Sequence, residues 1–170
     1  MSGRSKLTKA RAHHQQGQLA PAETIYNEIL KTEPGHPEAL NLLGVLLLQA
    51  DRAGEAAQIL ERAAAAEPDN AETVYNMGLA QLQLGRLEDA CSAFEKAVAL
   101  QPDFAAAANN LGNVLRQMGR FGPAAEAYGQ ALESEPGRAD IHANLGFARM
   151  KLGDHQGALA AAGKAQDLDP

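Results

Sequence analysis

Residues 71–104 read AETVYNMGLAQLQLGRLEDACSAFEKAVALQPDF, and the pattern of this stretch returns along the chain at steps of 34 residues. One proline, one glycine and one alanine keep this step in phase with one another. The recurring residues are Pro34, Pro68, Pro102, Pro136 and Pro170; Gly44, Gly78, Gly112 and Gly146; and Ala22, Ala56, Ala90, Ala124 and Ala158. Three residue types that recur together at one period indicate an array built from a single repeated unit.

The stretch 71–104 predicts two helices joined by a tight turn. Apolar residues in 71–84 are spaced as on one face of a helix, and a second helical stretch covers 87–100. Gly85 separates the two, because glycine readily adopts the positive φ found at helix ends. Pro102 ends the second helix, since proline cannot continue the hydrogen-bond ladder. In the other repeats the residue at the turn is Gly17, Asp51, Gly119 or Gly153.

We therefore expect an all-α chain of five helix-turn-helix repeats in one continuous domain. Their boundaries are 3–36, 37–70, 71–104, 105–138 and 139–170. The first repeat is atypical and cap-like, because polar residues replace large apolar ones in its first helix, which is predicted to be polar all round. The residues concerned are Lys6, Lys9 and His13.

The last repeat is atypical as well, since it carries Ala162 in place of an aromatic residue and no polar capping helix follows it. Two explanations are open: the chain is a segment of a longer protein, or something else covers this end. Weak self-association through the open repeat is one way to cover it. The surface then expected to stack is formed by Ala158, Ala162 and Ala165.

The recurring glycines require a steric explanation. A glycine inside a helix costs about 1 kcal/mol relative to alanine, so it persists where something needs the space. We predict that the paired second helix approaches closely there and that the recurring alanines form its opposing small surface. A large residue then fills the groove between repeats, namely Tyr26, Leu60, Phe94 or Tyr128.

Composition narrows the class of protein. Hydrophobic residues make up 45% of the chain and aromatic residues 4%, so the core is expected to consist mainly of leucine and alanine. A net charge of −6 argues against nucleic acid as the main partner, because phosphate binding needs a concentrated cationic face. The single cysteine, Cys91, allows no internal disulfide. Without a signal peptide or a membrane-spanning stretch, a cytoplasmic location is expected.

The phased residues resemble the tetratricopeptide repeat family, and the resemblance covers essentially the whole chain. Repeat 37–70 shows the motif as Leu40, Leu43-Gly44, Ala56, Leu60, Ala63 and Pro68, and repeat 71–104 shows it as Val74, Met77-Gly78, Ala90, Phe94, Ala97 and Pro102. The resemblance implies a right-handed α-solenoid of antiparallel helix pairs. It also implies a concave groove lined by the first helices.

No arrangement of residues points to catalysis, to a metal site or to a cofactor. His13 and His14 are adjacent and point about 100° apart on a helix, so they cannot chelate together. We interpret them as solvated cap residues. Cys91 lies beside a packing alanine and is predicted to be a buried, inert thiol. The cluster of basic residues near the N-terminus is read as an ordinary solvated terminus, with a weak contact to an anionic surface as the alternative; it comprises Arg4, Lys6, Lys9 and Arg11.

Helix geometry divides each first helix into two faces. At about 100° per residue, repeat positions 4, 7, 8 and 11 form the packing face, and positions 2, 5, 6, 9, 12 and 13 form the opposite one. The second set faces the groove and varies between repeats. We predict partner contacts from Asn41, Tyr75, Asn76, Leu79, Gln83, Asn109, Asn110, Asn113, Arg116, Gln117, Asn144, Phe147 and Lys151.

Position 6 of three successive repeats is asparagine: Asn76, Asn110 and Asn144. A carboxamide both donates and accepts hydrogen bonds, so this row can bind the backbone of an extended peptide, and we expect it to face water in the free protein. The row resembles the asparagine ladder of the repeat domains of O-linked N-acetylglucosamine transferases. Asparagine is common at this position across the family, so ordinary repeat consensus explains the row equally well.

A second comparison separates this chain from the repeats that clamp acidic chaperone tails. Those repeats carry lysine at position 5, whereas no repeat of this chain does. Apolar groove residues favour a ligand with hydrophobic side chains instead. The leading hypothesis is a protein-interaction scaffold that binds a peptide or a partner segment in its groove. The alternative is the substrate-recruiting region of a larger glycosyl- or sulfotransferase.

Overall fold

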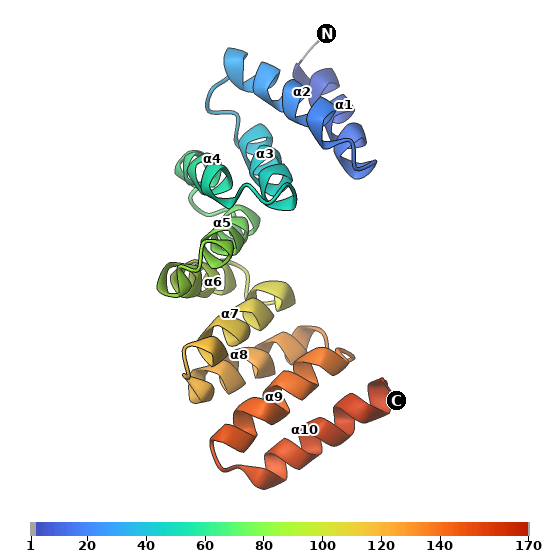
Figure 1. Cartoon of the computed structure of the whole chain (residues 1–170), viewed down its shortest axis with the longest axis vertical. Coiled ribbons are helices and arrows are strands. Elements are labelled where there is room, and N and C mark those ends of the chain that lie inside the picture. Colours follow the sequence, from blue (N-terminus) through green and yellow to red (C-terminus); the bar gives the residue numbers. More distant parts are fainter. Residues whose placement is uncertain (1–2, 170) are drawn as a thin grey trace. The chain divides into compact units, whose positions relative to one another are not determined.

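Ten α-helices make up nearly all of residues 3–169, the part of the chain that the computed structural model describes (Figure 1). They are α1 (Gly3–Gln15), α2 (Leu19–Thr32), α3 (Pro37–Gln49), α4 (Ala53–Ala66), α5 (Ala71–Gln83), α6 (Leu87–Leu100), α7 (Ala105–Gln117), α8 (Phe121–Ser134), α9 (Ala139–Lys151) and α10 (His155–Leu168). No strand occurs among these residues, so the all-α prediction is confirmed. Pro170 and the side chain of Arg4 lie outside the described part.

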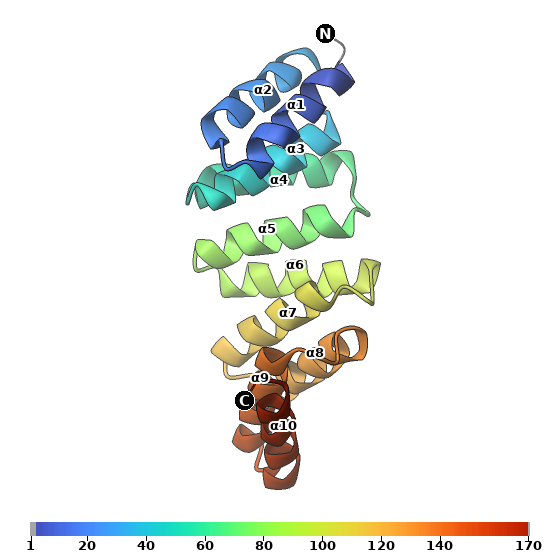
Figure 2. The ribbon, with the colours of Figure 1, turned by 90° about the vertical axis from the view of Figure 1, so that its right-hand side faces the viewer.

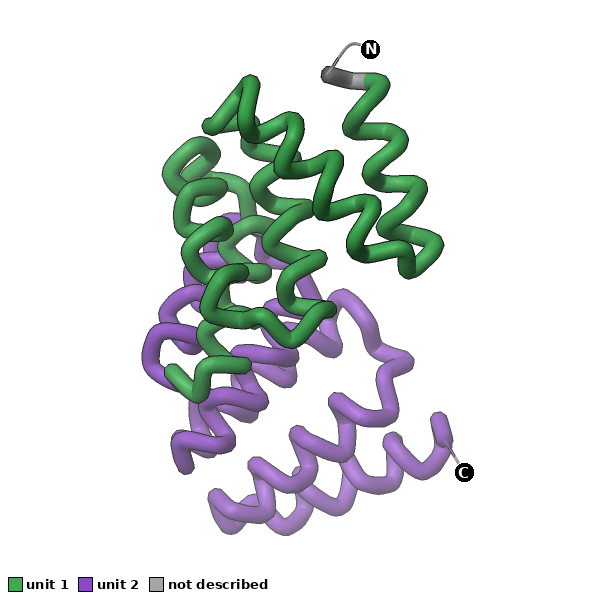
Figure 3. Tube along the Cα trace, turned by 45° about the horizontal axis from the view of Figure 1, so that its top comes forward, with its two compact units in different colours: residues 1–86 green, residues 87–170 purple. Residues whose placement is uncertain are grey.

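The helices group into two compact units, residues 1–86 and 87–170 (Figure 3). In the first unit α1 packs on α2, α3 on α4, and α5 on both α3 and α4. In the second unit each helix from α6 to α10 packs on the next one. Paired helices run antiparallel, as Figure 2 shows for α1 and α2 and Figure 1 for α9 and α10. The boundary between the units falls inside repeat 71–104, and the single continuous domain stays a prediction.

The turn between the two helices of each repeat has the predicted backbone conformation. Gly17, Gly85, Gly119 and Gly153 all have positive φ, between 72° and 80°. Asp51 takes the same place with a φ of 58° and is the one described residue other than glycine with positive φ. Aspartate is among the few residues that tolerate this region, because its short polar side chain can bond locally.

Two of the mid-helix glycines, Gly44 and Gly112, each make room for one large side chain. A Cβ atom on Gly44 would lie 2.5 Å from Cγ of Leu60, and one on Gly112 would lie 2.5 Å from Cε1 of Tyr128. Leu60 and Tyr128 come from the paired second helix and are fully buried. The predicted close approach is therefore confirmed with one correction. The large residue itself lies against the glycine, rather than the recurring alanine four positions before it.

Repeat 139–170 solves the same packing problem with small residues. Ala162 stands where the other repeats carry their large residue. The backbone of α10 approaches α9 instead, because a Cβ atom on Gly146 would lie 3.2 Å from the carbonyl oxygen of Ala158. Glycine is thus needed in both arrangements. At Gly44 and Gly112 it makes room for a large side chain, and at Gly146 it makes room for the backbone of α10.

The first helix is amphipathic, and the prediction that it is polar all round is wrong. Leu7 is 8% exposed and Ala10 is fully buried, both in the core that α1 shares with α2 and α3. Lys6 lies at the edge of this core, with Nζ 3.1 Å from a carboxylate oxygen of Glu28 on α2. The prediction failed because it was based on the polar residues at repeat positions 4, 7 and 11. The buried residues of α1, Leu7 and Ala10, stand at positions 5 and 8.

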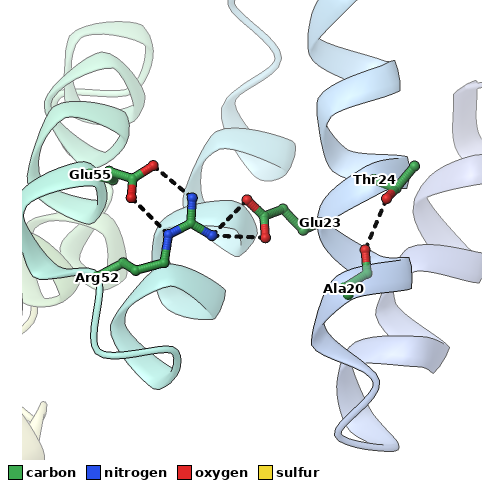
Figure 4. Close-up of polar contacts among 5 residues, drawn as sticks. All are labelled: Ala20, Glu23, Thr24, Arg52 and Glu55. Atoms are coloured by element: carbon green, nitrogen blue, oxygen red, sulfur yellow. Dashed lines mark hydrogen bonds and ion pairs between the residues drawn. The ribbon is translucent and has the colours of Figure 1, made fainter.

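Arg52 joins α2 of the first repeat to α4 of the second (Figure 4). Its guanidinium lies 2.8 and 2.9 Å from the two carboxylate oxygens of Glu23, and it donates two further bonds of 2.6 and 2.7 Å to Glu55. Hydrogen bonds to Glu55 and then Glu23 raise the pKa of Arg52, and the same contact lowers the pKa of Glu55. Because these groups are in contact with water, the pairs orient the helices more than they stabilise them.

The outer side of α10 exposes apolar residues, although not the predicted set. Ala158 is buried against α9, so it is not part of an open surface. Ala162 is exposed as predicted, and Ala165 is partly buried. The most exposed large apolar residue on this helix is Leu159, which is 76% exposed, and Leu168 is exposed too.

Candidate partner-binding face

The predicted groove residues lie on the first helix of each repeat, and we call the side of these helices that carries them the first-helix face. In the first unit this face is formed by α1, α3 and α5, and in the second unit by α7 and α9. The predicted contacts divide between the units in the same way. The first unit holds Asn41, Tyr75, Asn76, Leu79 and Gln83, and the second holds Asn109, Asn110, Asn113, Arg116, Gln117, Asn144, Phe147 and Lys151.

The carboxamides of the first unit bond to one another or to the backbone. The Asn76 amide donates to Oδ1 of Asn41 across α3 and α5 at 3.0 Å, and Asn76 is only 6% exposed. Gln83 of α5 lies 3.5 Å from the carbonyl oxygen of Leu48 on α3, a longer contact. The expectation that the asparagine row faces water is therefore wrong at Asn76, because packing of α5 on α3 covers this position.

We expect replacement of Asn76 by alanine to lower the free energy of unfolding by about 1–3 kcal/mol, because a buried bond is lost and Asn41 loses its donor. Chemical denaturation followed by circular dichroism measures this change. The control is Gln83→Ala on the same helix, which should change stability by less than about 0.5 kcal/mol because Gln83 is exposed. If both variants are equally stable, Asn76 is not a framework residue, and its role in ligand binding regains support.

Two cavities open on the first-helix face of the first unit. The larger, of about 550 Å³, is lined by Arg11, His14, Gln15, Gly17, Tyr26, Leu42 and Gln49. The smaller, of about 340 Å³, lies beside it, shares Arg11 and Leu42, and adds Asn41 and residues at the start of α3 and α5. Several of these residues were not in the predicted set. The available signal was their repeat position, since Leu42, Arg11, His14 and Gln15 occupy positions 6, 9, 12 and 13.

His14 is part of a hydrogen-bonded group, which corrects its interpretation as a solvated cap residue. Its Nε2 lies 3.0 Å from Oε1 of Gln49, and its Nδ1 lies 3.4 Å from the Tyr26 hydroxyl. Burial raises the pKa of Tyr26, so this hydroxyl stays protonated and can donate to the ring. Arg11, which lines both cavities, forms an ion pair with Glu38, which lines the smaller one. The larger cavity therefore offers hydrogen-bonding groups next to the aromatic side chain of Tyr26.

Asn113 is the centre of the polar contacts in the second unit. Its Oδ1 accepts a bond of 2.9 Å from the Tyr128 hydroxyl and one of 3.4 Å from the amide of Asn144. The contact joins α7 to both α8 and α9. Two other polar atoms of α7 are buried without a hydrogen-bond partner among the described residues, namely Oδ1 of Asn109 and Nε of Arg116.

Phe147 forms the most open aromatic surface of this face. It is 42% exposed, and its neighbour Met150, one helical turn further along α9, is 59% exposed. The Arg116 guanidinium from α7 lies 5.6 Å from the Phe147 ring centroid, and Lys151 Nζ lies 5.4 Å from it. The ring of Phe121 contacts Phe147 edge-on at a centroid distance of 6.2 Å. These residues offer apolar surface next to positive charge.

The single cysteine, Cys91, lies on α6 and so outside the first-helix faces. Cys91 is 4% exposed, and burial, followed by the nearby Glu95 carboxylate, raises the pKa of its thiol. This confirms the prediction that the cysteine is buried, and its inertness stays a prediction. In the described part of the chain, no group of histidine, cysteine, aspartate and glutamate is arranged to hold a metal ion. None of the helices described is long and apolar enough to cross a membrane.

Comparison with known families decides the classification. Two tetratricopeptide repeat models match residues 69–134 and 110–170, which together make up well over half of the chain. The chain belongs to the tetratricopeptide repeat family. A model of the anaphase-promoting complex, cyclosome, subunit 3 matches residues 15–97 and so reaches the N-terminal tetratricopeptide repeats. A comparison with curated proteins found no match.

Solved structures of tetratricopeptide repeat proteins resemble nearly the whole chain. A crystal structure of MamA is 26% identical, with a TM-score of 0.88, over 94% of each chain. A second MamA structure is 24% identical with a TM-score of 0.89, covering 98% of this chain and 91% of its own. YrrB, described as a TPR protein with an unusual peptide-binding site, is 23% identical with a TM-score of 0.84. The match covers 97% of this chain and 85% of the YrrB chain. The predicted architecture of paired helices is thereby confirmed.

Proposed function

We propose that this tetratricopeptide repeat protein is an interaction scaffold that binds a peptide segment of a partner protein on its first-helix faces. Members of the family bind proteins and peptides, and YrrB carries a peptide-binding site. The observation that carries the proposal is the solvent exposure of the Phe147 and Met150 side chains on α9. Large apolar side chains that remain exposed on a face with hydrogen-bonding groups are typical of interaction sites.

The polar groups of the same faces suit an extended backbone. Gln117 on α7 of the second unit is exposed, and a carboxamide can donate to a peptide carbonyl and accept from a peptide N–H at once. Asn76 is less available, because its amide is buried and bonded to Asn41. In the second unit, Gln117 therefore contacts the peptide backbone, and Phe147 and Met150 contact its side chains. The asparagine ladder proposed from the row at position 6 is supported less well than this arrangement.

Selection from a random peptide display library against the immobilised chain tests the proposal without knowledge of the natural partner. The dissociation constants of the selected peptides are then measured by isothermal titration calorimetry for the wild type and for Phe147→Ala. We expect a loss of roughly tenfold or more in affinity, because truncation of a central aromatic contact removes over about 1.4 kcal/mol.

The matched control is Leu159→Ala, which truncates an exposed apolar residue on α10 of the same unit. This variant should bind selected peptides as the wild type does. The proposal is wrong if the library yields no peptide, or if Leu159→Ala weakens binding while Phe147→Ala leaves it unchanged. The second result would place the binding surface on the second helices.

A further inference from the structure

Two positive charges of the second unit are paired with neighbouring carboxylates. Arg138 lies 2.9 Å from a carboxylate oxygen of Glu135 and 2.8 Å from one of Asp140, and Arg149 lies 3.9 Å from Asp154. Like Lys96, Arg120 and Lys164, the side chains of Arg116 and Lys151 form no ion pair with a carboxylate of the described residues. Both point at the exposed ring of Phe147 instead. A chain with a net charge of −6 thus leaves two cations uncompensated at one place.

The helix dipole accounts for part of this arrangement. Arg116 and Lys151 lie in the last turn of α7 and α9, where a positive charge is favourable. The dipole does not explain why two helices bring their cations to the same ring. Nε of Arg116 is buried and has no hydrogen-bond partner among the described residues. The arrangement therefore matches an anionic group supplied from outside.

We infer that Arg116, Phe147 and Lys151, together with Met150, form a subsite for an acidic side chain that stands next to a large apolar side chain in the partner peptide. This inference rests on the proposed function and specifies the chemistry of the partner. The carboxylate is attracted by the two cations, and the apolar side chain covers Phe147 and Met150. Closure by the peptide removes water from the cations, which strengthens their attraction for the carboxylate.

The subsite differs from the clamp of acidic chaperone tails. Its cations stand at repeat positions 12 and 13 of successive first helices, not at position 5, and an exposed aromatic ring lies between them. A nucleic acid fits less well, because a phosphate backbone requires a longer row of cations than two. Asp140 on the same helix is paired with Arg138 and does not neutralise the subsite.

Lys151 is the better residue for a substitution test of the subsite. Arg116 is less suitable, because it also lies beside the buried hydroxyl of Tyr128 and influences its pKa. Lys151 is exposed, so its substitution leaves the fold intact. The probes are a short acetylated and amidated peptide of alternating Asp and Leu, a matched peptide with Asn for Asp, and one with Lys for Asp. The wild type should bind the acidic peptide roughly tenfold more tightly than the Asn peptide, and less so at high salt.

Lys151→Gln should reduce this preference by several-fold, and Lys151→Glu should shift the preference toward the Lys peptide. The control is Lys164→Gln, an equal change of charge at an exposed site on α10, which should keep the preference of the wild type. Thermal melting confirms that all variants fold.

Four outcomes would overturn the inference. In the first, the selected library peptides bind, but they are not enriched in acidic side chains. The scaffold function then stands without this subsite. In the second, Lys164→Gln changes the preference as much as Lys151→Gln does. In the third, a single-stranded oligonucleotide displaces the acidic peptide and binds more tightly. In the fourth, sedimentation shows salt-dependent self-association that Lys151→Glu abolishes, which would make a second copy the occupant. Failure of the library to yield any peptide would instead reject the proposed function itself.

Discussion

Replacement of Gly112 by leucine should lower the free energy of unfolding of the protein by about 2–4 kcal/mol. The Cβ atom alone would lie 2.5 Å from Cε1 and 2.6 Å from Cδ1 of Tyr128. This ring cannot swing aside, because Tyr128 is fully buried and its hydroxyl is bonded to Asn113. The remaining atoms of a leucine side chain would force α7 and α8 apart. Chemical denaturation of the variant and the wild type measures the difference.

Gly129 provides a matched control on the partner helix of the same repeat. It also lies inside a helix, α8, but a Cβ atom there would meet nothing within 4 Å. Gly129→Leu should therefore stabilise the protein by about 0.5–1 kcal/mol, since leucine is the better helix former. The same substitution thus has opposite signs at the two glycines. Equal effects at both positions would show that Gly112 is not at a close contact.

Truncation of Tyr128 to alanine should cost about 3–5 kcal/mol, because a fully buried ring is replaced by a cavity above Gly112. Tyr128→Phe should cost only about 1 kcal/mol, since the ring still fills the space and a single hydrogen bond to Asn113 is lost. The same denaturation experiment compares the two variants. A similar cost for both would mean that the hydroxyl contact, rather than the packing of the ring, is the main contribution of this residue.

The double variant Gly112→Leu with Tyr128→Ala tests whether the two residues share one space. The leucine side chain can enter the cavity that the missing ring leaves. The combined loss should therefore be smaller than the sum of the single losses by about 1–3 kcal/mol. Strict additivity would contradict the proposed pairing of glycine and large residue.

Local chemistry made the repeats and their turns predictable from the sequence. The turn residues needed no knowledge of distant contacts, because positive φ is a property of one residue and its immediate neighbours. This holds even for Asp51, which was placed at the turn by the 34-residue step alone and has a φ of 58°. The helix bounds followed likewise from spacing and from proline, and α6 begins and ends where the pattern predicts.

The contacts between side chains were decided only by the tertiary structure. Helical periodicity assigns Asn76 to the first-helix face, but packing of α5 on α3 buries it against Asn41. The subsite around Phe147 depends on Arg116, which is 31 residues away in the sequence and comes close because α7 packs against α9. A repeat pattern states which side of a helix a residue occupies. How far the neighbouring helix covers that residue depends on the sizes of the side chains between them, and these differ from repeat to repeat.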